Sequence, residues 1–146
     1  MTQIRESAFV DGSPEEIWSV VSDPRNLPRW NRYVRSVHGV PEDGLAAGDR
    51  YWTEMGGFGI RFKIRAHVLE VDPPRYSKIR LDGPVDATVQ TWVHPAGKNR
   101  SRLEHQVDYE VRGGPIGRVV ARALRHLGAT AMLRRGVRAQ KRQVES

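Results

Sequence analysis

The sequence predicts an α+β domain in which a curved antiparallel sheet of seven strands surrounds a long C-terminal helix, with two short helices after the first strand. Three observations predict this fold. Capping signals begin a short helix at Ser13, apolar and polar residues alternate through most of residues 33–111, and a long amphipathic pattern without proline follows Pro115. The 146 residues suffice for one domain, residues 1–146, and no repeat or linker divides it.

The first strand leads directly into the first helix. Residues 3–11 alternate loosely between apolar and polar side chains, as a strand does. Ser13 can cap a helix, Pro14 suits the first helical position, and Glu16 lies three residues after the cap, as in a capping box. The apolar stripe of this helix consists of Ile17, Val20 and Val21. The helix is therefore expected to have barely three turns.

A second short helical element is expected before the next strand. Pro24 and Pro28 bracket residues 25–27, which leaves room for a single irregular turn. Trp30 stands at the end of this turn. Its bulky ring must be buried or must close an opening.

Six further strands are expected between residues 33 and 111, because alternating segments are separated by Gly, Pro, Asn and Asp. The second and third of these six form a predicted hairpin joined at Gly56 and Gly57. The expected ranges are 33–40, 48–55, 59–71, 75–81, 85–93 and 103–111.

The alternation predicts which side chains face the interior. In the strand over residues 59–71, Phe62 and Ile64 alternate with basic residues, so one face is half-buried and the other is wet. On the last strand, His105 and Tyr109 share the inward face.

A single helix is predicted over residues 116–141, roughly 40 Å long. One side of its helical wheel is apolar, and the other carries Arg118, Arg122 and Arg125. The apolar side consists of Ile116, Val119, Val120, Ala123, Leu124, Leu127 and Ala131. The helix is thus expected to lie on the sheet with its arginines in water.

Four motifs occur in a fixed order along these elements. They are SPEEIWSVVSDPRNLPRW, GDRYW at the start of the third strand, VDPPRY in a turn, and RGGPIGR at the entry to the last helix. With them, nearly the whole chain resembles the START-like (SRPBCC) helix-grip superfamily, which includes polyketide cyclases and dehydratases. The resemblance implies a cavity between the sheet and the long helix, used by relatives for carrying, sensing or converting ligands. A shared fold bounds function without fixing it.

The function expected from this resemblance is binding or carrying a small hydrophobic or amphipathic ligand in the cavity, with an anionic end as one option. The candidate lining residues are Trp30, Phe62, Ile64, His105, Tyr109, Leu124 and Leu127. Apolar residues at these spacings are also what an ordinary core requires, so the pattern leaves both interpretations open.

His105 and Tyr109 are the tentative catalytic residues if the protein is an enzyme. A neutral histidine and a phenol on a cavity wall can orient a carbonyl group or transfer protons in a cyclisation or dehydration. A buried pair with satisfied hydrogen bonds explains the same residues without catalysis. The sequence leans toward a binding protein.

Basic residues after Leu133 offer a second alternative, a surface-binding module. On a continuous wheel, Arg134, Arg138 and Lys141 fall on the stripe that Ile116 begins, which a core-facing helix does not tolerate. Either the helix extends past the sheet into solvent, or Arg134 and Arg138 receive an acidic ligand group at the cavity mouth, or the basic end contacts an anionic membrane, RNA or an acidic partner.

Composition excludes several chemistries. The chain has no cysteine, so disulfides and thiolate sites are absent. Its five histidines show no metal-ligand spacing, and no cofactor or metal is indicated. The net charge of +7 comes from the C-terminal segment, which has no aromatic residue after Tyr109 and so does not favour a nucleic-acid binder. Without a signal-peptide pattern or a membrane span, a cytoplasmic protein is expected.

Overall fold

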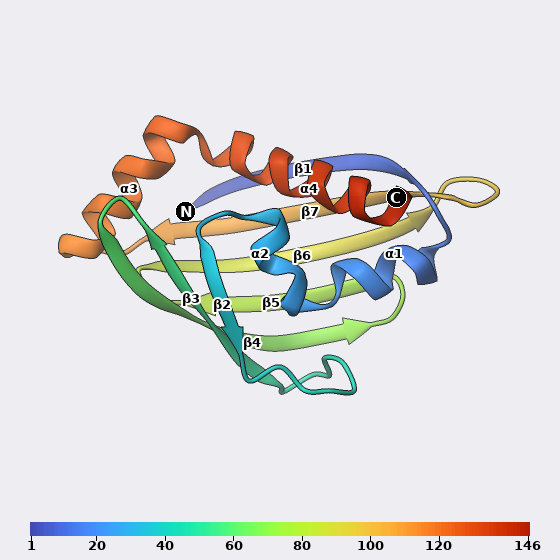
Figure 1. Cartoon of the computed structure of the whole chain (residues 1–146), viewed down its shortest axis with the longest axis horizontal. Helices are drawn as coiled ribbons and strands as arrows, with labels where there is room; N and C mark the ends of the chain where they lie inside the picture. The colour runs from blue at the N-terminus through green and yellow to red at the C-terminus, as the bar shows by residue number, and fades with distance from the viewer.

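The computed structural model describes residues 1–146, and it contains one seven-stranded antiparallel sheet in the order β1-β7-β6-β5-β4-β3-β2. Four α-helices and a short 3₁₀ helix, η1, complete the fold (Figure 1). The predicted fold class is confirmed. The strands are β1 (Thr2–Asp11), β2 (Val34–His38), β3 (Arg50–Gly57), β4 (Ile60–Asp72), β5 (Tyr76–Asp82), β6 (Val85–Pro95) and β7 (Arg100–Val111). The helices are α1 (Pro14–Val21), η1 (Pro24–Asn26), α2 (Leu27–Trp30), α3 (Pro115–Leu127) and α4 (Ala129–Glu145).

The sheet curves around one side of the molecule, and α4 runs along its β1 side (Figure 1). Helices α1 and α2 cross in front of the middle strands. None of the helices combines the length and the apolar character that crossing a membrane demands.

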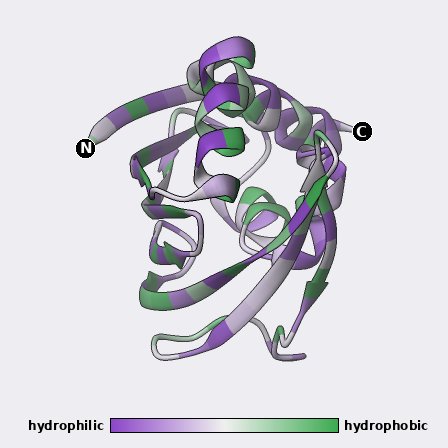
Figure 2. Cartoon of the chain, turned by 90° about the vertical axis from the view of Figure 1, so that its left-hand side faces the viewer, coloured by the Kyte–Doolittle hydropathy of each residue, from purple (hydrophilic) through white to green (hydrophobic).

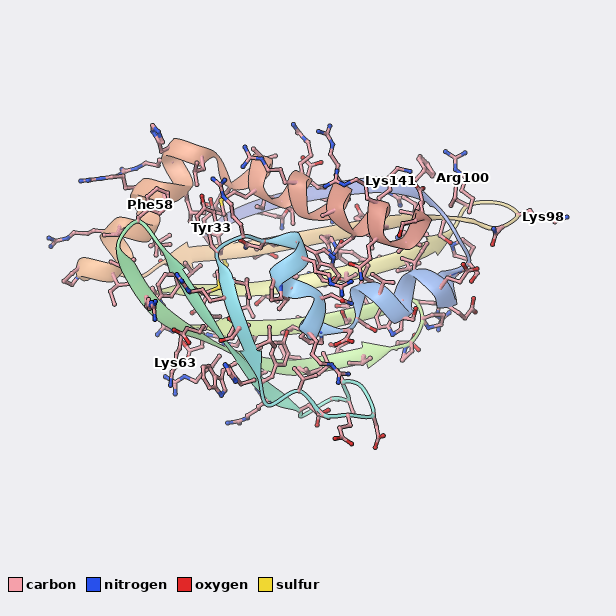
Figure 3. The ribbon with its side chains drawn as sticks, in the orientation of Figure 1. Tyr33, Phe58, Lys63, Lys98, Arg100 and Lys141 are labelled. Carbon is pink, nitrogen blue, oxygen red and sulfur yellow. The ribbon has the colours of Figure 1, made fainter.

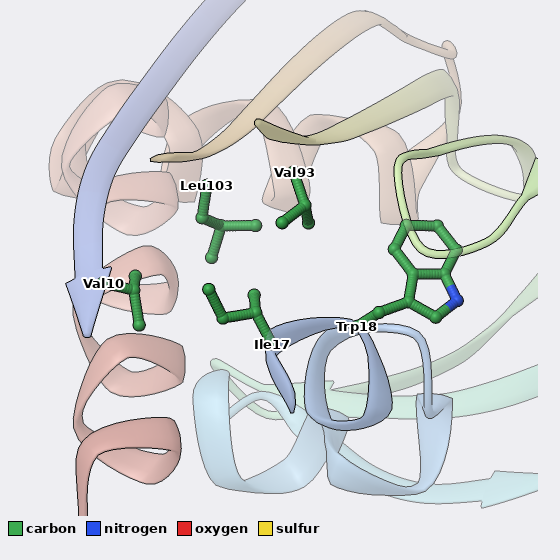
Figure 4. Close-up of a cluster of buried hydrophobic side chains, with 5 residues drawn as sticks. All are labelled: Val10, Ile17, Trp18, Val93 and Leu103. Carbon is green, nitrogen blue, oxygen red and sulfur yellow. The ribbon is translucent and has the colours of Figure 1, made fainter. Parts of the chain in front are cut away.

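Helix α1 begins with the predicted capping box. The Ser13 hydroxyl accepts from the Glu16 amide, and the Glu16 carboxylate accepts from the Ser13 amide. The cap fixes the direction of α1, so that Ile17 reaches the interior and is fully buried. The cluster around it joins α1 to β1, β6 and β7, and consists of Val10, Ile17, Trp18, Val93 and Leu103 (Figure 4).

The β3–β4 hairpin turns later than the sequence predicted. Gly56 and Gly57 belong to β3, and the two turn residues are Phe58 and Gly59, with φ of 54° and 78°. Two consecutive residues with positive φ are typical of the tight turn that matches strand twist. Gly57 is needed for another reason: a Cβ there would lie 2.8 Å from Cδ1 of the Tyr33 ring.

The C-terminal helix is interrupted, which corrects the single helix expected over residues 116–141. Gly128 has φ 82° and ψ 114°, a conformation outside the helical region, and it separates α3 from α4. The break resets the helical phase, so the wheel drawn from Ile116 does not apply to α4. The residues of α4 that face inward are Met132, Leu133, Gly136, Val137 and Gln140.

Helix α4 also covers the free edge of β1. Lys141 donates to the carbonyl of Phe9 at 2.9 Å, and the Glu145 carboxylate accepts from the amide of Asp11 at 2.9 Å. Arg134 pairs with Glu6 at 3.0 Å. These contacts hold α4 firmly against the sheet, whereas α3 buries only Gly117.

Candidate functional site

The fold encloses a cavity of about 660 Å³, and 32 of its 46 lining residues are hydrophobic. It lies between the inner face of the sheet and helices α2, α3 and α4. Only 22 of the 146 residues are buried, because the space that a core would fill is hollow. The volume falls within the range of about 300–1,000 Å³ typical of small-molecule sites.

Small side chains on the inner face of the sheet help to create this space. One cross-strand row reads Tyr51, Ala66, Leu81, Ala87 and Tyr109, and each member lines the cavity. Two alanines in the middle of the row leave room that larger residues would occupy. The two alanines therefore leave space beside Leu81 on the cavity wall.

A polar row crosses the same wall four residues further along the strands, beyond the apolar row of Ile79, Val89 and Val107. Ser77 on β5 pairs with Thr91 on β6, and Thr91 pairs with His105 on β7. Thr91 Oγ1 lies 2.8 Å from Nδ1 of His105, and Nε2 of His105 lies 2.7 Å from Oε1 of Gln140 on α4. We call Ser77, Thr91, His105 and Gln140 the interior polar row.

His105 is held neutral within this row. Burial lowers its pKa, and this effect outweighs the hydrogen bond to Gln140 and the charge of Glu104, which both favour the protonated form. The neutral ring donates from Nε2 to the Gln140 carbonyl oxygen and accepts at Nδ1 from the Thr91 hydroxyl. Both ring nitrogens are thus occupied.

The ends of the row remain open toward the cavity. The Gln140 side chain lines the cavity and its amide nitrogen makes no hydrogen bond within the protein. The Ser77 hydroxyl likewise has no protein partner. Buried polar groups ordinarily find partners, so these groups offer hydrogen bonds to a molecule inside the cavity.

Tyr51 presents another polar group on the cavity wall. The residue is only 7% exposed, and its hydroxyl has no hydrogen-bond partner within the protein. Burial raises the pKa of Tyr51, so the phenol stays protonated. The neighbouring Trp52 points to the opposite face of β3. Its ring stacks on that of His38, with centroids 4.1 Å apart, and Nζ of Lys63 lies 4.4 Å from the Trp52 ring centroid.

The structure brings together seven of the nine predicted ligand-binding residues as cavity lining. They are Trp30, Phe62, Ile64, His105, Tyr109, Leu124 and Leu127. Trp30 is further oriented by α4, because its indole nitrogen donates to Oε1 of Gln143 at 2.9 Å.

His105 and Tyr109 share the cavity face of β7, but they do not form a pair. Four residues along a strand span roughly 13 Å, and no hydrogen bond links the two side chains. The hydrogen-bonded neighbours of His105 are Thr91 and Gln140.

Arg134 and Arg138, the remaining two predicted residues, do not line the cavity. Both are exposed on α4, and Arg134 is engaged with Glu6 on β1. The break at Gly128 turns the inward face of α4 toward Val137 and Gln140 instead. These two arginines therefore cannot receive a ligand group inside the cavity in this arrangement.

Sequence reasoning missed Ser77, Thr91, Gln140 and Tyr51. Thr91 and Ser77 lie on strands whose inward faces were predicted or implied by alternation, but their alignment with His105 depends on cross-strand register. Gln140 lies beyond the helix break, where the wheel no longer held. No group of three His, Cys, Asp or Glu side chains is arranged to hold a metal ion.

Comparisons with solved structures agree with the observed fold. A conserved protein from Geobacillus kaustophilus is 22% identical and superposes with a TM-score of 0.76, covering 98% of this chain and 95% of that one. The Zhui aromatase/cyclase of a Streptomyces species is 14% identical with a TM-score of 0.75, covering 99% and 93%. A START superfamily protein from Mycobacterium smegmatis is 20% identical with a TM-score of 0.68, covering 98% and 97%.

Sequence comparison identifies the family directly. No curated protein matches the sequence. The family model described as polyketide cyclase / dehydrase and lipid transport, however, matches residues 1–145, almost the full length. The chain therefore belongs to the polyketide cyclase / dehydrase and lipid transport family.

Proposed function

We propose that this protein binds a small hydrophobic or amphipathic molecule in the cavity between the sheet and α3–α4. The observation that carries the proposal is the largely apolar cavity of about 660 Å³, which the interior polar row crosses. Apolar burial supplies most of the binding free energy, at about 25 cal/mol per Å². A few polar groups orient the ligand.

The open ends of the interior polar row indicate which ligand group would lie there. Gln140 Oε1 accepts from His105, so its amide nitrogen is the group left to donate. A carbonyl or ether oxygen on the ligand would complete that hydrogen bond. The Ser77 hydroxyl can donate or accept, and it therefore suits a carbonyl or a hydroxyl group.

Catalysis of a cyclase or dehydratase type is the alternative function. It is considered because the Zhui aromatase/cyclase has the same fold. The geometry favours binding, because a general base needs a free lone pair and the Nδ1 lone pair of His105 already accepts from Thr91. His105→Ala and Tyr109→Phe distinguish the two functions. A binding protein changes only in affinity, whereas an enzyme loses turnover.

Filling the cavity tests the proposal. Gly136 lines the cavity, and no atom lies within 4 Å of the position a Cβ would take. Gly136→Leu therefore adds an isobutyl group at the cavity wall, at a position where its Cβ meets no neighbour. Gly136→Ala is the matched control, since it makes the same change in the backbone and adds only a methyl group.

The readout is binding of the apolar dye Nile red, followed by its fluorescence, together with native mass spectrometry of the purified protein. We expect the wild type and Gly136→Ala to bind the dye, and Gly136→Leu to bind it much more weakly while keeping the same circular dichroism spectrum. If Gly136→Leu binds as the wild type does, the cavity is not the binding site and the proposal fails.

A further inference from the structure

The segment that closes the cavity is strongly cationic. Residues 115–142 contain eight basic side chains and no acidic one. On α3, Arg118, Arg122 and Arg125 are exposed on the face opposite the cavity, and none forms an ion pair. By contrast, Arg112 just before the helix is paired with Asp82 at 2.7 Å. The three arginines of α3 are therefore free to meet an anionic surface.

Exposed apolar side chains lie at the same end of the molecule. Phe58, at the tip of the β3–β4 hairpin, lines the cavity and is nevertheless 59% exposed. Ile116 in the first turn of α3 is 39% exposed. Figure 3 shows Phe58 at the hairpin tip, at the same end of the molecule as α3, with Tyr33 close by. The rings of Phe58 and Tyr33 stack with centroids 5.8 Å apart.

Helix α3 is attached to the sheet less firmly than α4 is. Its apolar side chains, including Leu124 and Leu127, are half-buried and face the hollow rather than a packed core. Gly114 and Gly128 bound it, both with positive φ. Figure 2 shows the molecule from this end, and residues of both α3 and the hairpin line the cavity.

We infer that α3 and the tip of the β3–β4 hairpin form a docking surface for a lipid bilayer that contains anionic headgroups. Cationic side chains attract such a surface, and exposed phenylalanine and isoleucine side chains enter its interfacial region. The chemistry fits a bilayer better than a nucleic acid, because the exposed groups beside the arginines are apolar. Both elements contribute side chains to the cavity lining, so docking would bring the lipid close to the cavity wall.

The test measures co-sedimentation of the full-length protein with phosphatidylcholine vesicles, with and without phosphatidylserine. We expect binding only to the phosphatidylserine vesicles, and weaker binding as salt rises. The triple variant Arg118→Gln, Arg122→Gln, Arg125→Gln should bind about 100-fold more weakly, since each cation near an anionic membrane contributes roughly a fivefold factor. Phe58→Ser should weaken binding at a salt concentration where the charges are screened.

The matched control is Arg135→Gln, Arg138→Gln, Arg142→Gln, which removes the same charge from exposed positions on α4 that form no ion pair. It should retain most of the binding. Equal losses in the two triple variants would mean that net charge alone matters and would overturn the proposal. So would binding to a single-stranded RNA oligonucleotide without binding to vesicles. Circular dichroism confirms that each variant is folded. Nile red binding by the two arginine variants stands independently of the vesicle result, because none of their six arginines lines the cavity.

Discussion

Nε2 of His105 lies 2.7 Å from Oε1 of Gln140, and this hydrogen bond joins the last strand to the last helix across the interior. Thr91 holds the other ring nitrogen at 2.8 Å. A buried neutral histidine with hydrogen bonds at both ring nitrogens is held in one tautomer and one orientation. The interior polar row is therefore a fixed element of the cavity wall.

Stability should depend on pH through His105. Burial lowers the pKa of His105 in the folded state, so below about pH 6.5 the unfolded chain takes up a proton that the folded chain resists. The free energy of unfolding should then decrease as the pH falls through about 6.5 toward the lower folded-state pKa. Urea unfolding at pH 7.5 and at pH 5.5 measures this change.

In the variant His105→Asn, the free energy of unfolding should decrease less over the same pH interval, because the contribution of His105 is gone. The other four histidines are present in both proteins, so their contributions cancel in the comparison. Identical pH dependences for the two proteins would show that His105 is protonated as easily in the folded state as in the unfolded one.

Two hydroxyl groups of the cavity wall should respond differently to removal. Thr91→Val removes the donor to Nδ1 of His105 and should lower the free energy of unfolding by about 1–3 kcal/mol. Tyr51→Phe removes a hydroxyl that has no protein partner, so the free energy of unfolding should change by less than about 0.5 kcal/mol. Urea unfolding of both variants compares them, and a large loss in Tyr51→Phe would reveal a partner for its hydroxyl.

Truncating a leucine should lower the free energy of unfolding more in the packed core than beside the cavity. Leu103 is 1% exposed within the Ile17 cluster, and Leu103→Ala should cost about 2–5 kcal/mol of unfolding free energy. Leu124 is half-buried against the hollow, so Leu124→Ala removes fewer contacts and should cost less than half as much. Chemical denaturation measures both. Equal costs would indicate that the cavity is packed in solution.

Two glycines of the C-terminal segment should respond to alanine with opposite signs. At Gly128 the positive φ disfavours any side chain, so Gly128→Ala should destabilise the protein by about 1–2 kcal/mol. Gly136 lies within α4 with open space around its Cβ position, so Gly136→Ala should stabilise it by about 0.5–1 kcal/mol. Thermal unfolding followed by circular dichroism gives the sign of each change. Stabilisation by Gly128→Ala would mean that the helix is continuous in solution.

The sequence predicted the parts of the site that depend on periodicity within one element. Alternation along β4 and β7 assigned Phe62 and His105 to the inner face, because successive side chains of a strand point to opposite sides. It could not predict that Ser77 and Thr91 align with His105, since register is a relation between strands and is set by turns and packing.

Gln140 was missed for a different physical reason. An isolated glycine inside a helical pattern is usually tolerated, so the pattern gave no sign that Gly128 would leave the helical conformation. The continuous helical wheel therefore predicted the wrong inward face beyond Gly128. It placed Arg134 and Arg138 on the inward side, whereas both are exposed. The hairpin turn was misplaced because three glycines near residue 57 offered several equivalent turn positions.

The contacts between α4 and β1 also protect one edge of the sheet from pairing with strands of other molecules. Exposed strand edges invite a further strand to add by backbone hydrogen bonding. Here Lys141 and Glu145 occupy backbone groups of β1 at Phe9 and Asp11. The opposite edge, β2, is five residues long and is irregular between Val34 and Ser36. Both edges thus resist β-addition, and the sheet can remain wrapped around its cavity without recruiting neighbouring chains into aggregates.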